Sequence, residues 1–224
     1  MNNMDPDTFE ERKRILINYL ISEGILKSEK VINAFESVPR HLFVTTEHLD
    51  EAYVDEPIPI IEGTTISQPS VVAEVLEELE LEDGNKVLEV GTGSGWLTGL
   101  LSYCVGENGL IISLDGNMFV VEFAKRNLDK IKAKNVEVII ADGTLGYARR
   151  SPYDRIVYSI AMPELPKIVL DQLKINGIAI APIGSKDAQQ LVKITRESEK
   201  KYKTEELGDV VFAPAYGKFG FHEI

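Results

Sequence analysis

Residues 86–99 read KVLEVGTGSGWLTG, and this stretch decides the fold of the chain. Val87, Leu88 and Val90 are apolar and partly β-branched, which is typical of a buried parallel strand. Three alternating glycines follow, and from Trp96 onward the apolar residues have helical spacing. A strand, a glycine turn and a helix in this order form an elbow that binds a nucleotide or a similar cofactor, because glycine lets the backbone turn sharply and a ligand approach closely.

The glycine spacing separates two classes of cofactor. A dinucleotide site has the pattern G-x-G-x-x-G, but Trp96 occupies the position of its third glycine here. The observed pattern is G-x-G-x-G with an acidic residue inside the strand. This is the pattern of Rossmann-like methyltransferases that use S-adenosyl-L-methionine (SAM). We therefore predict a cofactor site formed by Glu89, Gly91, Thr92, Gly93 and Gly95.

Strands and helices alternate after this elbow, which predicts an α/β fold of the Rossmann-like class. The sheet is expected to be doubly wound and mostly parallel, with a partly antiparallel end. Ligands of such sheets bind at the carboxyl ends of the strands. The expected helices are 118–131 and, with its lead-in, 163–173, and the expected strands are 86–90, 110–114, 136–140, 154–160, 177–183, 190–195 and 210–213.

Two aspartates end predicted strands and extend the cofactor site. Asp115 follows the second strand, where a carboxylate can accept hydrogen bonds from both ribose hydroxyls. Asp142 follows the third strand, and we predict that it accepts from an adenine amino group. Gly143 is expected to let the adenine ring lie close to the backbone.

The first 68 residues are predicted to form a helical extension and a loop that covers substrate and cofactor. Thr8 and Glu11 resemble a capping box for a helix through about residue 22, and Ser28 caps a second, short helix. Residues 45–68 are long and irregular, and a loop of this length is usually functional. Pro69 then opens a helix. We expect residues 69–224 to form one compact methyltransferase domain.

Composition limits the partners and the compartment. The 224 residues carry 24 Lys and Arg against 36 Asp and Glu, a net charge of −12. This acidic balance disfavours nucleic acid as a substrate. Cys104 is the single cysteine, the N-terminus is polar, and no apolar run approaches the ~20 residues that cross a bilayer. These features predict a cytoplasmic protein without a membrane partner. The three histidines lack metal-ligand spacing, so no metal site is predicted.

Motifs along nearly the whole chain resemble the protein-L-isoaspartate O-methyltransferase family. The most specific is TISQP (65–69), because general methyltransferases lack it. Two departures from the family are visible. The ribose residue is usually Glu in the family and is Asp115 here, and residues 158–164 read YSIAMPE where small residues are usual. The other matching segments are SVPRHLFV (37–44), AYVDEPIPI (52–60), GTTISQPSVVA (63–73), VLEVGTGSGW (87–96), DGTLGY (142–147), APIG (181–184) and the Gln-x-Leu at 189–191.

The resemblance implies a methyl transfer that initiates repair of damaged proteins. SAM would donate its methyl group to the free carboxylate of an L-isoaspartyl residue, leaving S-adenosyl-L-homocysteine. A carboxylate with a pKa near ~4 is ionised at neutral pH, so no general base is needed. What remains is to orient the carboxylate and strip it of water. We predict Ser67 as the catalytic, orienting hydroxyl, and Thr64, Thr65, Ser67, Ile160 and Ala161 as substrate-binding residues.

Three other functions stay open at this point. A SAM-dependent methyltransferase could act on another small carboxylic acid or on RNA. A NAD-dependent dehydrogenase is disfavoured by Trp96 at the third glycine position. A binding module could recognise damaged proteins without any cofactor. Oligomeric state and peptide preference are not determined by the sequence.

Overall fold

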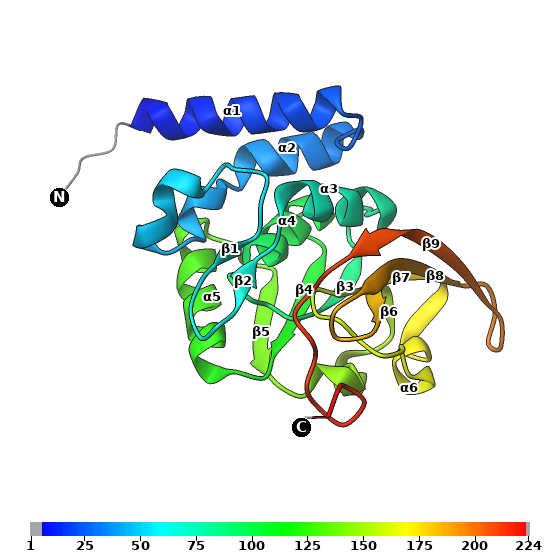
Figure 1. The fold of residues 1–224 in the computed structure, drawn as a ribbon. Coiled ribbons are helices and arrows are strands. Elements are labelled where there is room, and N and C mark those ends of the chain that lie inside the picture. Colours follow the sequence, from blue (N-terminus) through cyan, green and yellow to red (C-terminus); the bar gives the residue numbers. More distant parts are fainter. Residues whose placement is uncertain (1–5, 223–224) are drawn as a thin grey trace.

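A seven-stranded sheet lies between layers of helices and turns in the computed structural model, which describes residues 6–222. The strand order is β5-β4-β3-β6-β7-β8-β9, and a separate two-stranded sheet joins β1 to β2 (Figure 1). The helices are α1 Pro6–Ser22, α2 Glu29–Ser37, α3 Pro69–Glu78, α4 Trp96–Val105, α5 Met118–Lys130 and α6 Lys167–Leu170. The strands are β1 Ile58–Pro59, β2 Thr65–Ile66, β3 Lys86–Val90, β4 Leu110–Asp115, β5 Val136–Ile140, β6 Tyr153–Tyr158, β7 Leu173–Gly184, β8 Gln189–Arg196 and β9 Tyr202–Val210.

The topology fixes where a ligand can bind. Strands β5, β4, β3, β6 and β7 are parallel, and β8 and β9 are antiparallel additions at the end of the sheet. Val90 pairs with Leu114 on one side and with Tyr158 on the other, so β3, β4 and β6 end together. The chain order changes direction between β3 and β6, and such a switch point opens a crevice at the carboxyl ends of the strands. The predicted fold class is confirmed.

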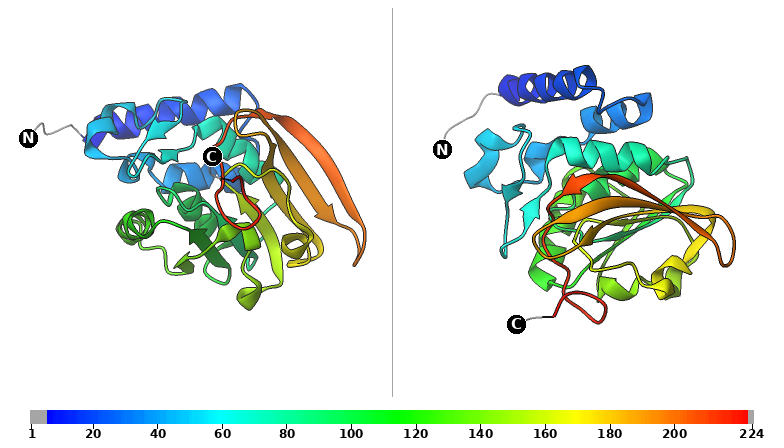
Figure 2. Two further views of the ribbon diagram at one scale, coloured as in Figure 1. Left: turned by 60° about the horizontal axis from the view of Figure 1, so that its bottom comes forward. Right: turned by 45° about the vertical axis from the view of Figure 1, so that its right-hand side comes forward.

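Each face of the sheet has its own hydrophobic cluster. Val87 and Ile111 face the cluster formed with α1 to α4, whereas Leu88 and Ile112 face the cluster with α6. The α1 and α2 helices stack outside α3 and α4 on one side of the sheet (Figure 2). The helical extension shares a core with the sheet, so residues 16–68 pack against the domain beginning at residue 69. The boundary at residue 68 stays a prediction.

Several predicted boundaries are wrong for local reasons. The first helix begins at Pro6 and not after Thr8, since proline is favourable in a first helical turn. The last strand is 202–210 and not 210–213. It is an edge strand with mostly exposed polar side chains, so it lacks the apolar alternation of a strand with one buried face. The strand predicted at 177–183 spans 173–184, and the one predicted at 154–160 ends at Tyr158. The helix predicted within 163–173 is a single turn, α6.

The predicted covering loop is more ordered than expected. Residues 46–51 form the 3-10 helix η2, and Ile58 and Pro59 pair with Ile66 and Thr65 as β1 and β2.

The predicted cap of the second helix, Ser28, is confirmed, because its side chain accepts from the backbone N–H of Val31.

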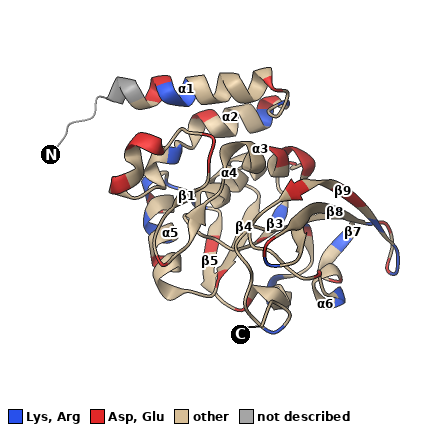
Figure 3. Cartoon of the chain, viewed as in Figure 1, with Lys and Arg blue, Asp and Glu red and all other residues tan. Residues whose placement is uncertain are grey.

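Charged side chains are spread over several elements, with acidic residues gathered at the end of α3 (Figure 3). Within the described range of 6–222, no helix is long and apolar enough to span a bilayer.

Candidate active site

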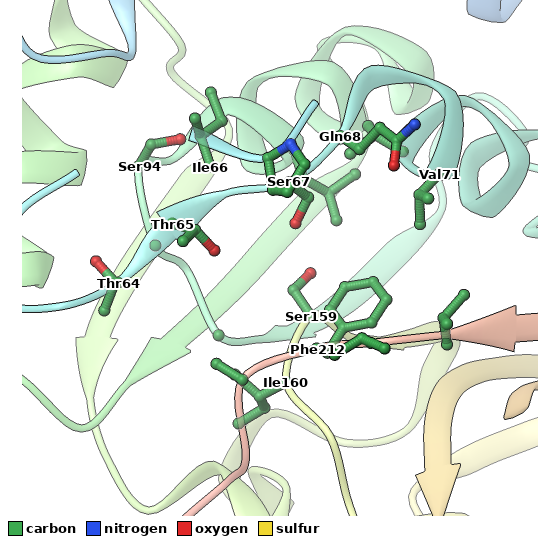
Figure 4. Close-up of a pocket in the computed structure, with 18 of the residues that line it drawn as sticks. Thr64, Thr65, Ile66, Ser67, Gln68, Val71, Ser94, Ser159, Ile160 and Phe212 are labelled. Carbon is green, nitrogen blue, oxygen red and sulfur yellow. The ribbon is translucent and has the colours of Figure 1, made fainter. Parts of the chain in front are cut away.

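A cavity of about 710 Å³ opens at the carboxyl ends of β3, β4 and β6. Its volume lies in the range of small-molecule sites. Its floor is the glycine turn, one wall is the segment 64–68 with the first turn of α3, and the opposite wall is 209–213 with residues 159 and 160 (Figure 4). The switch point of the sheet therefore carries a site that residues distant in sequence enclose.

The glycine turn depends on backbone conformations that other residues rarely adopt. Gly91, Gly93 and Gly95 have φ angles of +93°, +53° and +84°. A Cβ at Gly91 would lie 2.9 Å from the Ile160 side chain, and one at Gly93 would lie 3.6 Å from the Thr65 carbonyl oxygen. Gly91 and Gly93 line the cavity, whereas Gly95 caps α4 and packs against α5. The turn thus presents its main chain to the cavity directly beneath the covering loop.

Asp115 lies at the edge of this cavity, where the sequence predicted a ribose contact. Its Oδ2 accepts from the Gly93 N–H at 3.3 Å, and its Oδ1 accepts from the Asn117 N–H at 3.0 Å. Each carboxylate oxygen can accept a further hydrogen bond. The side chain is held by both neighbouring turns and still lines the cavity, so its carboxylate fits the hydroxyls of a SAM ribose.

Glu89 lies beneath the glycine turn and does not line the cavity. It is fully buried, and its Oε2 accepts from Thr98 at 2.5 Å and from Ser113 at 2.7 Å, while the Ser113 hydroxyl contacts that of Thr92 at 2.6 Å. Its Oε1 has no hydrogen-bond partner within the described residues. Burial raises the pKa of Glu89 to about 7, against the opposing effect of the two hydroxyls. Glu89 therefore reaches the cavity only through Ser113 and Thr92.

We expect this buried acid to make folding stability depend on pH. Its pKa is raised from 4.5 to about 7, so between these values the folded state binds more protons than the unfolded state. Stability from this group is therefore highest below pH 4.5 and is lost as pH rises to 7, by ~3 kcal/mol. Glu89→Gln, which stays neutral, removes this dependence. Urea unfolding of both proteins across this pH range checks it, and equal pH dependence in both would contradict it.

Asp142 and Gly143 lie outside the cavity lining, beside the chain's C-terminal segment. Asp142 accepts from the N–H and hydroxyl of Thr144 and from the Lys218 N–H. Partial burial raises its pKa, but these hydrogen bonds and the Lys218 charge outweigh burial and hold the pKa below its usual value. A Cβ at Gly143 would lie 2.2 Å from the Val90 side chain. Packing against β3 thus explains this glycine without a ligand, and the adenine contact stays a prediction.

The three hydroxyls predicted to bind substrate differ in whether they can donate a hydrogen bond into the cavity. Ser67 and Ser159 turn their hydroxyls toward one another across the cavity (Figure 4). The Thr64 hydroxyl donates to the Ile61 carbonyl at 2.6 Å, so its proton is already used. Thr65 lines the cavity from the exposed side of β2. Ser67 is therefore the best placed of the three predicted donors.

The structure adds a wall that sequence reasoning missed. Ser159 and Ile160 line the cavity, but Ala161 is fully buried, its N–H donates to the Ala213 carbonyl, and it is not part of the described lining. Phe212 and its neighbours in 209–213 close the cavity opposite Ser67. The sequence predicts a strand at 210–213, but β9 ends at Val210 and the residues after it enter the site. Their position at the site depends on the chain crossing back over the strand ends, which no local pattern signals.

The sheet order, the glycine turn and an aspartate that lines the cavity are the features of a Rossmann-like, SAM-dependent methyltransferase. Residues 11–220 match the sequence model of the protein-L-isoaspartate(D-aspartate) O-methyltransferase family. A protein-L-isoaspartate O-methyltransferase of Pyrococcus horikoshii is 42% identical and covers 98% of this chain and 100% of its own length. One of Archaeoglobus fulgidus is 43% identical over 96% of this chain and 98% of its own. The chain therefore belongs to the protein-L-isoaspartate O-methyltransferase family.

Solved structures agree with this assignment. A Plasmodium falciparum protein described as a protein-L-isoaspartate O-methyltransferase, in complex with S-adenosyl-L-homocysteine, superposes with a TM-score of 0.82 at 27% identity, covering 92% of this chain and 98% of that one. Another protein-L-isoaspartate O-methyltransferase superposes with a TM-score of 0.83 at 30% identity, covering 93% of this chain and 67% of the other.

Proposed function

We propose that the cavity above the glycine turn is where this methyltransferase acts on damaged proteins. It transfers the methyl group of SAM to the free carboxylate of L-isoaspartyl residues, which initiates their repair. Within the cavity we assign Asp115 and the backbone of Gly91 and Gly93 to the cofactor, and Ser67 to the substrate carboxylate. The observation that carries this assignment is that Ser67 and the glycine turn share one cavity.

The chemistry requires little of the protein beyond placement. Bound SAM supplies an electrophilic methyl group, and the substrate carboxylate is already an anion at neutral pH. Among the described lining residues only Asp115 and Asp209 carry charge, so the cavity offers no cation that would neutralise the nucleophile. A hydroxyl donor such as Ser67 can orient one carboxylate oxygen while the other stays free to attack. Closure of the covering loop over bound substrate would exclude water and strengthen such contacts.

The same charges argue against RNA as a substrate. A phosphate backbone is bound through Lys and Arg side chains. The described lining residues include neither, and the chain carries a net charge of −12. Damaged peptide segments are therefore the partners that this site favours.

Methyl transfer from tritiated SAM to two matched peptides tests the proposed function. One peptide contains an L-isoaspartyl residue, and the other contains aspartate at the same position. We expect base-labile tritium in the isoaspartyl peptide alone. Equal labelling of both peptides, or labelling of neither in a protein that binds S-adenosyl-L-homocysteine, would overturn the assigned substrate.

Closure of the covering loop is a separate prediction. Residues 45–67 include a turn in which Glu62 and Gly63 both have positive φ, and several exposed side chains. Binding of both ligands should close this loop over the cavity and slow its cleavage by a protease, since lids close on substrate. Limited proteolysis with and without S-adenosyl-L-homocysteine plus isoaspartyl peptide measures this. Cleavage at unchanged rate would identify a static surface loop.

A further inference from the structure

One buried arginine connects the middle of the covering loop to its C-terminal end. Arg40 begins the 3-10 helix η1, Arg40–Leu42, and its side chain is 1% exposed. Its Nη1 donates to the Ala52 carbonyl at 2.8 Å, and its Nη2 donates to the carbonyls of Glu56 and Ser67 at 3.0 Å each. The planar guanidinium fork suits several fixed acceptors at once, which a lysine ammonium does not. A single side chain thereby fixes the carbonyl of the residue that presents its hydroxyl to the cavity.

The same arginine also contacts the helix that follows the glycine turn. Its guanidinium carbon lies 5.2 Å from the centre of the Trp96 ring. Trp96 is the first residue of α4, and its Nε1 donates to the carbonyl of Val38, two residues before Arg40. Arg40 therefore contacts both the covering loop and the first residue of the helix that follows the glycine turn. Asp55 fixes the segment from the other side, because it accepts from the Gln68 side chain and from the Ser70 N–H.

Burying the Arg40 guanidinium costs desolvation free energy, so it contributes little to the stability of the fold. Burial lowers the pKa of Arg40 to about 10, with a partial opposing effect from the charge of Asp55. Within residues 6–222 no carboxylate lies at ion-pair distance from it, and its Nε has no hydrogen-bond partner. Apolar residues often replace buried charged groups without loss of stability. The geometry that the fork imposes on the loop is a better account of its presence.

We propose that Arg40 is a positioning residue for methyl transfer, which holds the Ser67 hydroxyl above the glycine turn. This inference rests on the proposed role of Ser67. Freed from Arg40, the loop would let that hydroxyl move, and a misplacement of about 1 Å can cost up to 100-fold in rate. The cofactor contacts of Gly93 and Asp115 do not involve Arg40, so cofactor affinity should stay unchanged.

The experiment compares Arg40→Lys with Arg155→Lys in the full-length enzyme. Arg155 is a matched control, because its guanidinium also donates to backbone carbonyls, those of Leu79 and Glu80, but at the end of α3 away from the cavity. We expect kcat on an isoaspartyl peptide to fall about tenfold or more in Arg40→Lys and less than twofold in Arg155→Lys. The dissociation constant for S-adenosyl-L-homocysteine should change less than twofold in both.

A double variant decides whether the effect passes through Ser67. If it does, Ser67→Ala should cost much less in the Arg40→Lys background than in the wild type. Additive losses, or full turnover of Arg40→Lys, would overturn the inference while leaving the role of Ser67 intact. Full turnover of Ser67→Ala alone would instead overturn the proposed role of Ser67. If neither Arg40→Lys nor Arg40→Gln folds by circular dichroism, Arg40 serves stability and the inference is wrong.

Discussion

Ser67→Ala is expected to bind SAM normally and to transfer methyl about 100-fold more slowly. The Ser67 hydroxyl points into the cavity, while its carbonyl is held by Arg40. Loss of the hydroxyl leaves the segment in place and removes only the donor that orients the substrate carboxylate. The loss should appear in kcat on an isoaspartyl peptide, measured with tritiated SAM. Calorimetric titration with S-adenosyl-L-homocysteine should give an unchanged dissociation constant.

Two further variants sharpen this test. Ser67→Thr keeps the hydroxyl and should lose less activity, although its extra methyl group reduces the space in the cavity. Ser70→Ala removes a hydroxyl three residues later, on α3 and outside the cavity lining, and should leave turnover unchanged. Full activity of Ser67→Ala would refute the orienting role. A loss found wholly in cofactor affinity would make Ser67 a cofactor contact.

Asp115→Ala should weaken binding of S-adenosyl-L-homocysteine by about 1.5–3 kcal/mol, the range for hydrogen bonds to a charged group. This corresponds to between about tenfold and about a hundredfold in the dissociation constant. The substitution removes the predicted acceptors of the ribose hydroxyls and the acceptor that fixes the Gly93 N–H. Both changes act on the cofactor side of the cavity.

The controls for Asp115 distinguish the carboxylate from general damage. Asp115→Glu keeps the carboxylate and has the residue usual in the family, so it should retain most of the affinity. Asp129→Ala removes an exposed carboxylate from α5 and should leave the affinity unchanged. An Asp115→Ala variant with wild-type affinity would show that the ribose lies elsewhere.

Local sequence patterns were enough to predict the fold class and the floor of the site. The apolar run of β3, the positive-φ glycines and the helical spacing after Trp96 are properties of neighbouring residues. Asp115 could be placed as well, because parallel strands end at the same edge of a sheet. The TISQP segment identified Ser67 through a family resemblance and not through geometry.

Glu89 marks the limit of such reasoning. Strand β3 is buried on both faces, so a residue inside it points to a covering helix and not to the ligand. The structure turns Glu89 toward Thr98 of α4, where burial changes its protonation. The sequence indicated an acidic residue in the right strand but not the direction of its side chain.

The sequence by itself determined the class of fold, the cofactor turn and the family, because these depend on short-range periodicity and on motifs. Only the tertiary structure decided which distant segments enclose the cavity. Phe212 faces Ser67 because the chain crosses back after β9, and Arg40 reaches the Ser67 carbonyl across 27 residues of sequence. Such contacts follow from strand order and from satisfaction of buried polar groups, which are properties of the whole folded chain.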